Sequence, residues 1–435
     1  MTKAPISLQE LRRRIYLKAK SDKTHRFWGI YTHIAKMEVL REAYEQAKKN
    51  GGAPGIDGTT FAQIEELGVI PFLEEIRNDL TLREYKPQGN RAVEIPKSNG
   101  KTRTLQIPCI RDRVVQGALK FILEPIFEAD FCDNSYGFRP KRSPHRALAE
   151  VRRSLLRRMD VVIDVDLFDY FNTIRHSILL NKIAQRIQDP DVMHLIKQIL
   201  KIGGSVGVPQ GGPLSPLAAN IYLNEIDWVF DEIRKKTKQG EFERVNYHRF
   251  ADDIVIAIDA HPNKRGWPER AMQLLREKLK PLGVKLNPEK TKMVNTGRNE
   301  SFEYLGFDLS RVKKKGKSGE FILLTPKKKA RQKMKAEIRE AIRRGGDASV
   351  ERIIDKINSK LGGWVNYFRV GNSSRAFSEI REYTEMKIRT LLTRRKRRHK
   401  TSVGWKRWSN EYLYGVLDLY WDWNIRPLKN PEAYS

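Results

Sequence analysis

Apolar residues recur at helical spacing in several parts of the chain. The segments SLQELRRRIYLKAK (7–20) and KMEVLREAYEQAKKN (36–50) each place apolar side chains on one helical face, and Gly51-Gly52 follows the second as a helix stop. Similar patterns predict further helices over 64–82, 113–131, 178–202 and 268–282, and one that begins near Leu217.

Short apolar runs between these segments predict strands. VEIP and TLQIP flank SNGKTR as a hairpin, VVIDVDL (161–167) is a β-branched strand, and VNYHRF and IVIAI flank Ala251-Asp252-Asp253. FEYLGFDL (302–309) is rich in strand formers, and the remainder of the chain reads as mostly helical. Because hairpins and helices mix without regular βα alternation, the pattern predicts an α+β fold.

Composition narrows the class of protein. A length of 435 residues suggests two to four domains, and a hydrophobic share of 40% is too high for a disordered chain. Lys and Arg number 83 against 53 Asp and Glu, a net charge of +30 that favours a polyanionic partner. The N-terminus has no apolar signal core, no run suits a membrane span, and two cysteines cannot build a disulfide framework. We therefore expect a cytoplasmic protein, associated with nucleoid or RNA and with no membrane partner.

The positive charge is concentrated near the C-terminus. Residues 311–435 hold 32 Lys and Arg against 13 Asp and Glu. The densest runs lie in segments with helical periodicity and aromatic residues, which favours an ordered basic surface over a solvated tail, while most of the aromatics should fill a core. The predicted RNA-binding residues are Lys327, Lys328, Lys329, Arg331, Arg394, Arg395, Arg397 and Arg398.

Two pairs of carboxylates end or join apolar strands. Asp164 and Asp166 lie on one side of a strand, and Asp252 and Asp253 lie at a tight hairpin. A single Asp in such a place is more often a turn or cap residue, but two sites in apolar strands suit Mg²⁺, which prefers oxygen ligands. Two such ions can activate a 3′-hydroxyl and stabilise a leaving pyrophosphate.

Two further segments could contact a nucleotide. SVGVPQGGPLSPLAANIYL (205–223) is either an ordinary Gly/Pro loop or a loop that packs against a base pair, with Gln210 touching the nucleotide. Lys97 and Arg103 lie on opposite arms of the basic hairpin, where they are either solvated charges or a clamp for a triphosphate.

The motifs, taken together and in order, resemble the bacterial reverse transcriptases of the group II intron maturase family. The matching segments run from about Tyr44 to at least Phe368: GAPGIDGTT, VEIPKSNGKTRTLQIP, EPIFEADFCDNSYGFRP, VVIDVDLFDYFNTIRH, GVPQGGPLSPLAANIYLNEID, HRFADDIVI, LNPEKTK, FEYLGF and GGWVNYF. The resemblance implies a right-hand polymerase with fingers, palm and thumb.

It also implies roles for particular residues. Asp166, Asp252 and Asp253 match the catalytic carboxylates, which would hold two Mg²⁺ ions, or Mn²⁺ as a substitute, with help from the Leu167 carbonyl. The positions that match the family's dNTP contacts are Lys97, Arg103, Phe171, Gln210 and Gly211, and those that match its primer grip are Phe302, Leu305, Gly306 and Phe307.

The expected domains follow the same resemblance. They are an N-terminal helical extension (1–50), fingers (51–160), palm (161–310), helical thumb or maturase domain (311–400) and a basic, aromatic C-terminal segment (401–435).

The chain departs from the family pattern at several positions. The family often carries Tyr, Lys-Gly and Asp where this chain has Phe250, Phe168-Asp169 and Asn172. A C-terminal HNH endonuclease is not expected, since no cysteine follows Cys132.

These observations predict an RNA-directed DNA polymerase that also binds intron RNA as a splicing maturase. Its partners would be an RNA template, intron RNA, a DNA primer or target and dNTPs, with the oligomeric state left open. One alternative is a splicing cofactor without polymerase activity. Another is a domesticated reverse transcriptase with a defence, CRISPR-associated or repair role.

Overall fold

The computed structural model describes residues 6–96, 102–238, 244–259, 266–316, 318–395 and 407–428. The chain forms two compact units. The first comprises Met1–Arg142, Val165–Ile254 and Gly266–Thr291, and the second comprises Ser143–Asp164, Val255–Arg265 and Lys292–Ser435. None of the helices within the described ranges is long and apolar enough to cross a lipid bilayer.

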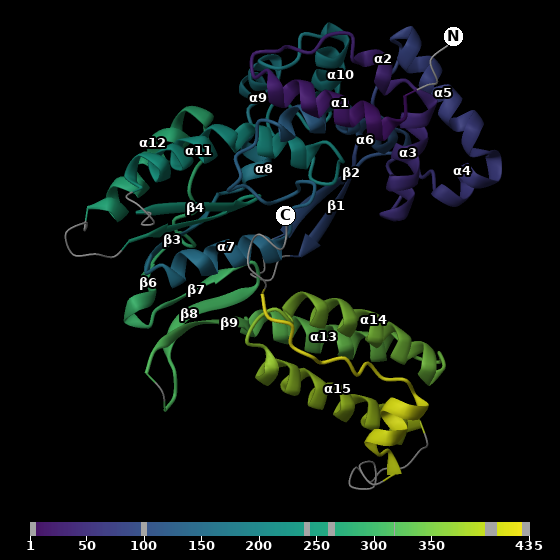
Figure 1. The fold of residues 1–435 in the computed structure, drawn as a ribbon. Helices are drawn as coiled ribbons and strands as arrows, with labels where there is room; N and C mark the ends of the chain where they lie inside the picture. The colour runs from purple at the N-terminus through teal and green to yellow at the C-terminus, as the bar shows by residue number, and fades with distance from the viewer. Residues whose placement is uncertain are drawn as a thin grey trace. The chain divides into compact units, whose positions relative to one another are not determined.

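The first unit is mainly helical (Figure 1). Its helices are α1 (Leu8–Ser21), α2 (Tyr31–Ile34), α3 (Met37–Lys49), α4 (Phe61–Leu67), α5 (Val69–Leu82), α6 (Ile110–Glu128), α8 (Tyr170–Thr173), α9 (His176–Ala184), α10 (Pro190–Lys201), α11 (Ser215–Thr237) and α12 (Trp267–Leu282). Helix α6 is buried along most of its length, and α1 and α3 pack against it. Gly117 permits the approach of α3, because an added Cβ would lie 3.1 Å from Cβ of Ala43.

A two-stranded and a four-stranded sheet carry the motif residues. Strands β1 (Arg91–Pro96) and β2 (Thr102–Ile107) form the predicted antiparallel hairpin, with Ile95 opposite Arg103. The larger sheet has the order β4-β5-β3-β6, formed by β4 (Val245–Phe250), β5 (Asp253–Ile258), β3 (Val161–Asp166) and β6 (Lys292–Asn295). The division between the units passes through β3 and β5.

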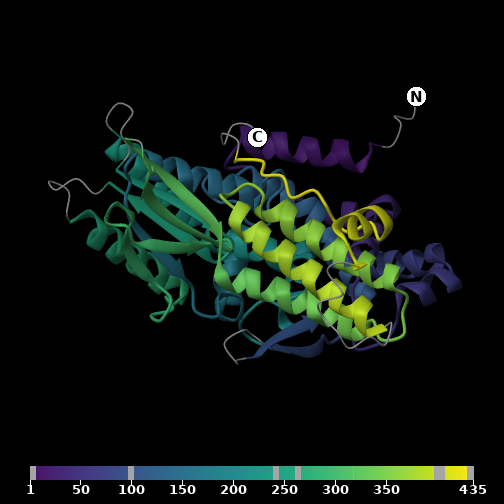
Figure 2. The same ribbon diagram turned by 90° about the horizontal axis from the view of Figure 1, so that it is seen from below.

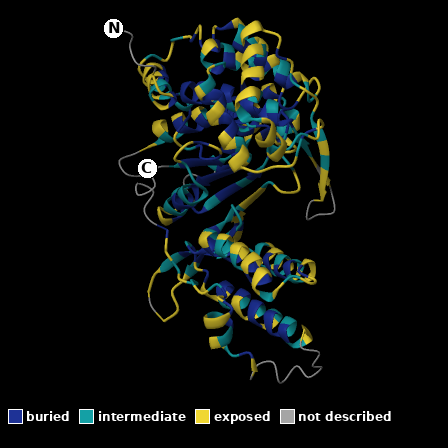
Figure 3. Cartoon of the chain, turned by 90° about the vertical axis from the view of Figure 1, so that its right-hand side faces the viewer, coloured by how far each residue is buried: buried dark blue, intermediate teal, exposed yellow. Residues whose placement is uncertain are grey.

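The second unit combines a sheet with a helical bundle. Strands β7 (Ser301–Tyr304), β8 (Phe307–Lys313) and β9 (Glu320–Pro326) form an antiparallel sheet, on which α7 (Pro144–Leu156) packs. The bundle contains α13 (Lys328–Arg344), α14 (Val350–Phe368) and α15 (Ser374–Arg395), and each of these helices has buried and exposed positions (Figure 3). A short π-helix (Tyr412–Val416) and an extended segment follow.

The extended C-terminal segment runs along α14 in both ribbon views (Figure 2). Asn358 accepts a hydrogen bond from the Tyr420 N–H, and the Arg426 N–H donates to the Arg369 carbonyl. The bundle core also includes side chains from the π-helix and the residues on either side of it, namely Trp408, Leu413, Leu417 and Leu419.

The predicted α+β class and the antiparallel strands are confirmed, but two predicted helices are each split. The helix expected over 64–82 is broken at Gly68, whose φ of +105° a helix cannot contain. The helix expected over 178–202 is interrupted because the Asp189 carboxylate caps a new helix that begins with Pro190. The strand-rich segment near residue 302 also extends further than expected, since β9 reaches Pro326.

Candidate active site

The candidate site is built around Asp166, the last residue of β3. Its backbone carbonyl accepts a hydrogen bond of 2.8 Å from the Asn287 N–H. Leu167 then forms an antiparallel bridge with Leu286, and the Phe168 N–H donates to the Lys285 carbonyl over 2.8 Å. The segment after α12 therefore fixes the turn that presents the Asp166 carboxylate.

The Lys290 side chain contacts the Asp166 carboxylate directly. Its Nζ lies 2.6 Å from Oδ2, while the Asn287 amide donates to Oδ1 over 3.3 Å. The hydrogen bond to Asp166 raises the pKa of Lys290 above its usual value, and the negative charges of Asp166, Asp253 and Asp252 raise it further. One ammonium group thus lies in the field of all three predicted catalytic carboxylates.

A buried ion pair supports the turn that carries Asp252 and Asp253. The Arg249 guanidinium contacts both carboxylate oxygens of Asp227, at 2.7 and 2.6 Å, and both side chains are fully buried. The guanidinium also donates to the Ala251 carbonyl over 3.0 Å. Burial acts to lower the pKa of Arg249, but the charge of Asp227 and its hydrogen bond outweigh burial and raise this pKa.

The NSYGFRP segment lies against the same turn. The Arg249 N–H donates to the Asn134 carbonyl, and the Tyr136 N–H donates to the Arg249 carbonyl, so this segment pairs with β4. Gly137 then touches the turn itself, because a Cβ added there would lie 2.4 Å from the Ala251 nitrogen. Only a residue without a side chain fits this position.

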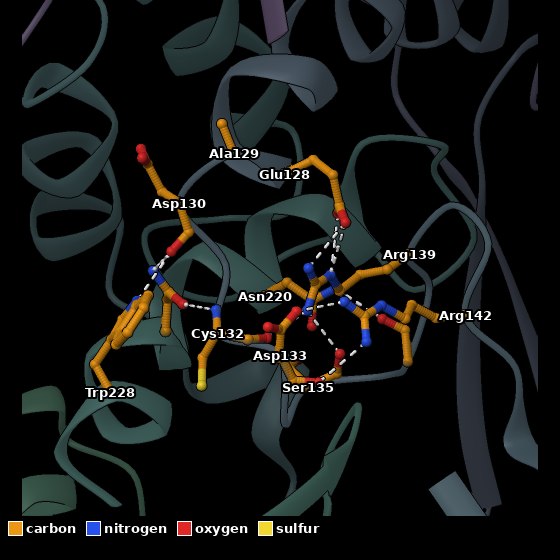
Figure 4. A network of polar contacts seen from close by, with 12 residues as sticks. Glu128, Ala129, Asp130, Cys132, Asp133, Ser135, Arg139, Arg142, Asn220 and Trp228 are labelled. Carbon is orange, nitrogen blue, oxygen red and sulfur yellow. Dashed lines mark hydrogen bonds and ion pairs between the residues drawn. The ribbon is translucent and has the colours of Figure 1, made fainter. Parts of the chain in front are cut away.

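A network of polar contacts anchors the NSYGFRP segment (Figure 4). The Arg139 guanidinium pairs with Glu128 at 2.8 Å and donates to the carbonyls of Cys132 and Ser135. The Asn220 amide donates to the Gly137 carbonyl over 2.8 Å. Arg139 and Asn220 therefore fix the segment whose Gly137 packs against the turn before Asp252.

Backbone hydrogen bonds join three of the segments predicted to contact a dNTP. The Gln106 N–H of β2 donates to the Gln210 carbonyl over 2.9 Å, and the Val208 N–H donates to the Phe171 carbonyl over 2.8 Å. Gly211 has a φ of +135°, and an added Cβ would lie 2.6 Å from the Gln106 carbonyl oxygen. The loop, β2 and α8 consequently form one connected surface.

The other two predicted dNTP contacts are only partly described. Lys97 lies outside the described residues. Arg103 lies on β2 opposite Ile95, while its side chain is outside the described part of the structure. Their contact with a triphosphate remains a prediction.

The predicted primer grip forms the turn between β7 and β8. Leu305 and Gly306 both have positive φ values at its tip, and the Tyr367 hydroxyl donates to the Leu305 carbonyl over 2.9 Å. Phe302 and Phe307 are buried in the second unit. Their rings are therefore part of the core, and contact of the turn with a primer remains a prediction.

The predicted RNA-binding residues differ in their exposure and in whether their side chains already pair within the protein. Lys328 and Lys329 are exposed at the start of α13, and Arg394 is exposed near the end of α15. Lys327 pairs with Glu303, Arg331 pairs with Glu379, and Arg395 donates to the carbonyls of Gly346 and Ala348. Arg397 and Arg398 lie outside the described residues.

Sequence reasoning gave no individual role to the residues that hold the carboxylates. These residues are Gly137, Asp227, Arg249, Asn287 and Lys290. All five lie within motifs quoted above, namely EPIFEADFCDNSYGFRP, GVPQGGPLSPLAANIYLNEID, HRFADDIVI and LNPEKTK. The pairing of Arg249 with Asp227 gave no sequence signal, because the two residues lie on β4 and α11 and come together only in the fold.

The carboxylates have the chemistry that a hard divalent cation needs. Within the described residues, no group of three or more His, Cys, Asp or Glu side chains has the geometry of a metal site. Asp166 and Asp253 nevertheless lie on neighbouring strands, and the Lys290 ammonium already binds the Asp166 carboxylate. Since Mg²⁺ takes oxygen ligands of this kind, the donor set fits the cation.

Comparison with known proteins matches two parts of the chain. Residues 95–309 match the family described as "Reverse transcriptase (RNA-dependent DNA polymerase)", and residues 331–421 match "Group II intron, maturase-specific domain". Protein YkfC of Escherichia coli (strain K12) is 32% identical over 369 residues, which cover 74% of this chain and 94% of that protein. The group II intron-encoded protein LtrA of Lactococcus lactis subsp. cremoris is 27% identical over 453 residues, covering 83% of this chain and 74% of LtrA. These matches agree with the resemblance predicted from the order of the motifs.

Proposed function

This chain belongs to the group II intron reverse transcriptase and maturase family, and we propose that Asp166, Asp252 and Asp253 carry out its polymerase chemistry. Membership makes it an RNA-directed DNA polymerase with a maturase domain. The observation that carries the assignment is the position of the Lys290 ammonium, which lies 2.6 Å from the Asp166 carboxylate, where the charges of Asp253 and Asp252 also act on it.

Reverse transcriptases use divalent cations such as Mg²⁺. Here two Mg²⁺ ions, with Mn²⁺ as a substitute, would be held by the three carboxylates and the Leu167 carbonyl, and would supply Lewis acidity for attack of a primer 3′-hydroxyl on the α-phosphate of a dNTP. Asn287 and Lys290 orient the Asp166 carboxylate before substrate arrives. The buried Arg249 guanidinium donates a hydrogen bond to the Ala251 carbonyl and so fixes the backbone that leads into Asp252.

The dNTP would bind beside these carboxylates. Phe171 would exclude a ribose 2′-hydroxyl, and Gln210 and Gly211 would lie beneath the incoming nucleotide. Support for this placement comes from the backbone hydrogen bonds that link Phe171 and Gln210 to one surface. Lys97 and Arg103 would neutralise the triphosphate, Lys97 as a point charge and Arg103 as a fork.

The domain assignment is part of the same proposal. Residues 51–160 would act as fingers, 161–310 as palm and 311–400 as thumb, with 1–50 and 401–435 as flanking segments. The turn at Leu305 and Gly306 would position the primer. The basic residues at the start of α13 and the end of α15 would bind intron RNA in the cytoplasm.

The polymerase assignment is tested by primer extension with Mg²⁺ on an RNA template. Asp252→Asn should lower the extension rate by roughly 10³-fold or more, because it removes charge that stabilises the transition state. Asp347→Asn, an exposed carboxylate after α13, is the matched control and should leave the rate unchanged. Full extension by Asp252→Asn would refute the site assignment.

The maturase assignment is tested by sequencing the RNA that copurifies with the protein from its native cells. One abundant structured RNA encoded around this reading frame would support intron RNA as the partner. Enrichment of an unrelated small RNA or of phage transcripts would instead favour a domesticated reverse transcriptase with the same site.

A further inference from the structure

The first unit contains a cleft whose charged lining is entirely positive. It has a volume of about 420 Å³ and is lined by Arg175, Arg276, Lys280 and Lys285 together with apolar side chains and Gly283. We call this the basic cleft. Among the residues that the structure describes, none of its lining residues is acidic.

The walls of the basic cleft are fixed by one buried side chain. The Tyr222 hydroxyl accepts a hydrogen bond from the Arg175 N–H over 3.2 Å and donates to the Leu282 carbonyl over 2.6 Å. One bond holds the start of α9 and the other holds the end of α12. Because Tyr222 is fully buried, the spacing between these two walls is set by the core.

The floor of the basic cleft is Gly283, the residue that ends α12. It has a φ of +69°, and its N–H donates to the Lys280 carbonyl. A Cβ added there would lie 2.6 Å from Nε of Arg175. The Arg175 guanidinium therefore lies directly over the glycine backbone, a position that a side chain would block.

The four cations are available to a ligand. All four side chains are exposed, and within the described ranges no acidic side chain forms an ion pair with them. Glu277 of the same helix instead accepts a hydrogen bond from Gln273, and Glu225 pairs with Lys182. Four cations in a fixed concave site favour a ligand with several negative charges.

We infer that the basic cleft binds the phosphodiester backbone of RNA. Successive phosphates supply repeated negative charge, and guanidinium and ammonium groups are the side chains that contact them. None of the three carboxylates, and none of the basic residues of α13 and α15, is among the residues that line the cleft. The Lys285 backbone carbonyl also accepts a hydrogen bond from the Phe168 N–H, so an RNA strand held by this residue is anchored to the backbone that carries Asp166.

The test uses the full-length protein and a fluorescein-labelled single-stranded oligouridylate, with affinity measured at several salt concentrations. The cleft variant is Arg276→Glu/Lys280→Glu. Its matched control is Arg270→Glu/Lys278→Glu, which reverses two charges on the same helix. These two residues line a different cleft. A neutral version, Arg276→Gln/Lys280→Gln, reports whether the effect follows from lost contacts, and thermal unfolding checks that all variants fold.

We expect the neutral version to reduce the log–log salt slope by about 1.4, that is, by about 0.7 for each lost phosphate contact. The charge reversal should weaken binding further, and the control should bind with nearly the original slope. Equal affinity and slope in the cleft and control variants would overturn the inference. Weaker binding of inorganic pyrophosphate with unchanged RNA binding would also overturn it, in favour of a site for small phosphates.

The outcome is independent of the proposed polymerase site. Primer extension at saturating primer–template should be unchanged in the cleft variant. If extension depends on Asp252 but the cleft variant binds RNA normally, only this inference fails. If Asp252→Asn extends normally while the cleft variant loses RNA affinity, only the polymerase assignment fails.

Discussion

Gly137 shows how a single residue without a side chain supports the site. Its backbone contacts Ala251, where an added Cβ would lie 2.4 Å from a backbone nitrogen. Gly137→Ala should therefore displace the turn that carries Asp252 and destabilise the protein by about 1–3 kcal/mol through overpacking. Primer extension and urea unfolding measure the two effects.

Gly89→Ala is the matched control, because no atom lies within 4 Å of a Cβ added there. It should leave both the extension rate and the free energy of unfolding close to their original values. If both alanine variants behave alike, the close contact at Gly137 does not hold the turn.

The Arg249–Asp227 pair predicts a large effect on stability from the loss of one charge. Both side chains are fully buried, so Asp227→Asn leaves a guanidinium in the core without its carboxylate. We expect the free energy of unfolding to fall by about 3–5 kcal/mol, measured by urea unfolding. Glu232→Gln breaks the exposed pair with Lys236 on the same helix and should cost about 1 kcal/mol or less. Equal costs would contradict this account of the buried pair.

Lys290 competes with any cation for the Asp166 carboxylate. Lys290→Met removes this competitor, whose exposed ion pair is worth about 1 kcal/mol at most. The apparent affinity for Mg²⁺ should therefore increase by up to about fivefold, measured by thermal shift without nucleic acid. Lys278→Met, which lies elsewhere on the protein surface, should leave this affinity unchanged. An unchanged or weaker affinity in Lys290→Met would show that the ammonium does not compete.

At the scale of elements, the C-terminal segment belongs to the packing of the helical bundle. Leu413 is fully buried in the same core as Ile357 of α14, whereas Val416 is 67% exposed. Leu413→Ala should lower the free energy of unfolding by about 2–5 kcal/mol, and Val416→Ala should change it by about 0.5 kcal/mol or less. Urea unfolding followed by tryptophan fluorescence measures both. Similar small effects would mean that the segment packs only loosely on the bundle.

The same scale shows which parts of the fold the sequence could reveal. The β1–β2 hairpin and the strands around Asp166 and Asp252 were predictable because β-branched runs and turn residues mark them locally. The break at Gly68 was missed because apolar periodicity continues through it, and only the positive φ ends the helix. The restart at Asp189 and Pro190 carries a recognisable cap signal that the wider periodicity obscured.

The site was predictable to a similar extent. Motif order is enough to propose Asp166, Asp252 and Asp253, because those residues lie within continuous local patterns. Their supports are distant in sequence: Lys290 lies 124 residues from Asp166, and Arg249 lies 22 residues from Asp227. Such contacts depend on how helices and strands pack, which single-sequence patterns do not encode.

At the scale of the whole molecule, the proposed polymerase site and the basic residues of α13 that are proposed to bind intron RNA lie in different units. The carboxylates lie in the first unit, and the exposed Lys328 and Lys329 lie in the second. Asp252→Ala should therefore lose primer extension by roughly 10³-fold or more while it binds intron RNA with unchanged affinity and salt dependence.

Lys328→Ala/Lys329→Ala should show the opposite result. Loss of two phosphate contacts should reduce the log–log salt slope of RNA binding by about 1.4, while extension of a saturating primer–template is retained. Lys333→Ala/Lys360→Ala is the control, because both ammonium groups already pair with Glu337 and should contribute less to RNA binding. Loss of both primer extension and RNA binding in either Asp252→Ala or Lys328→Ala/Lys329→Ala would contradict this division. A change confined to one unit would then have altered the function assigned to the other unit, so one surface would serve both functions.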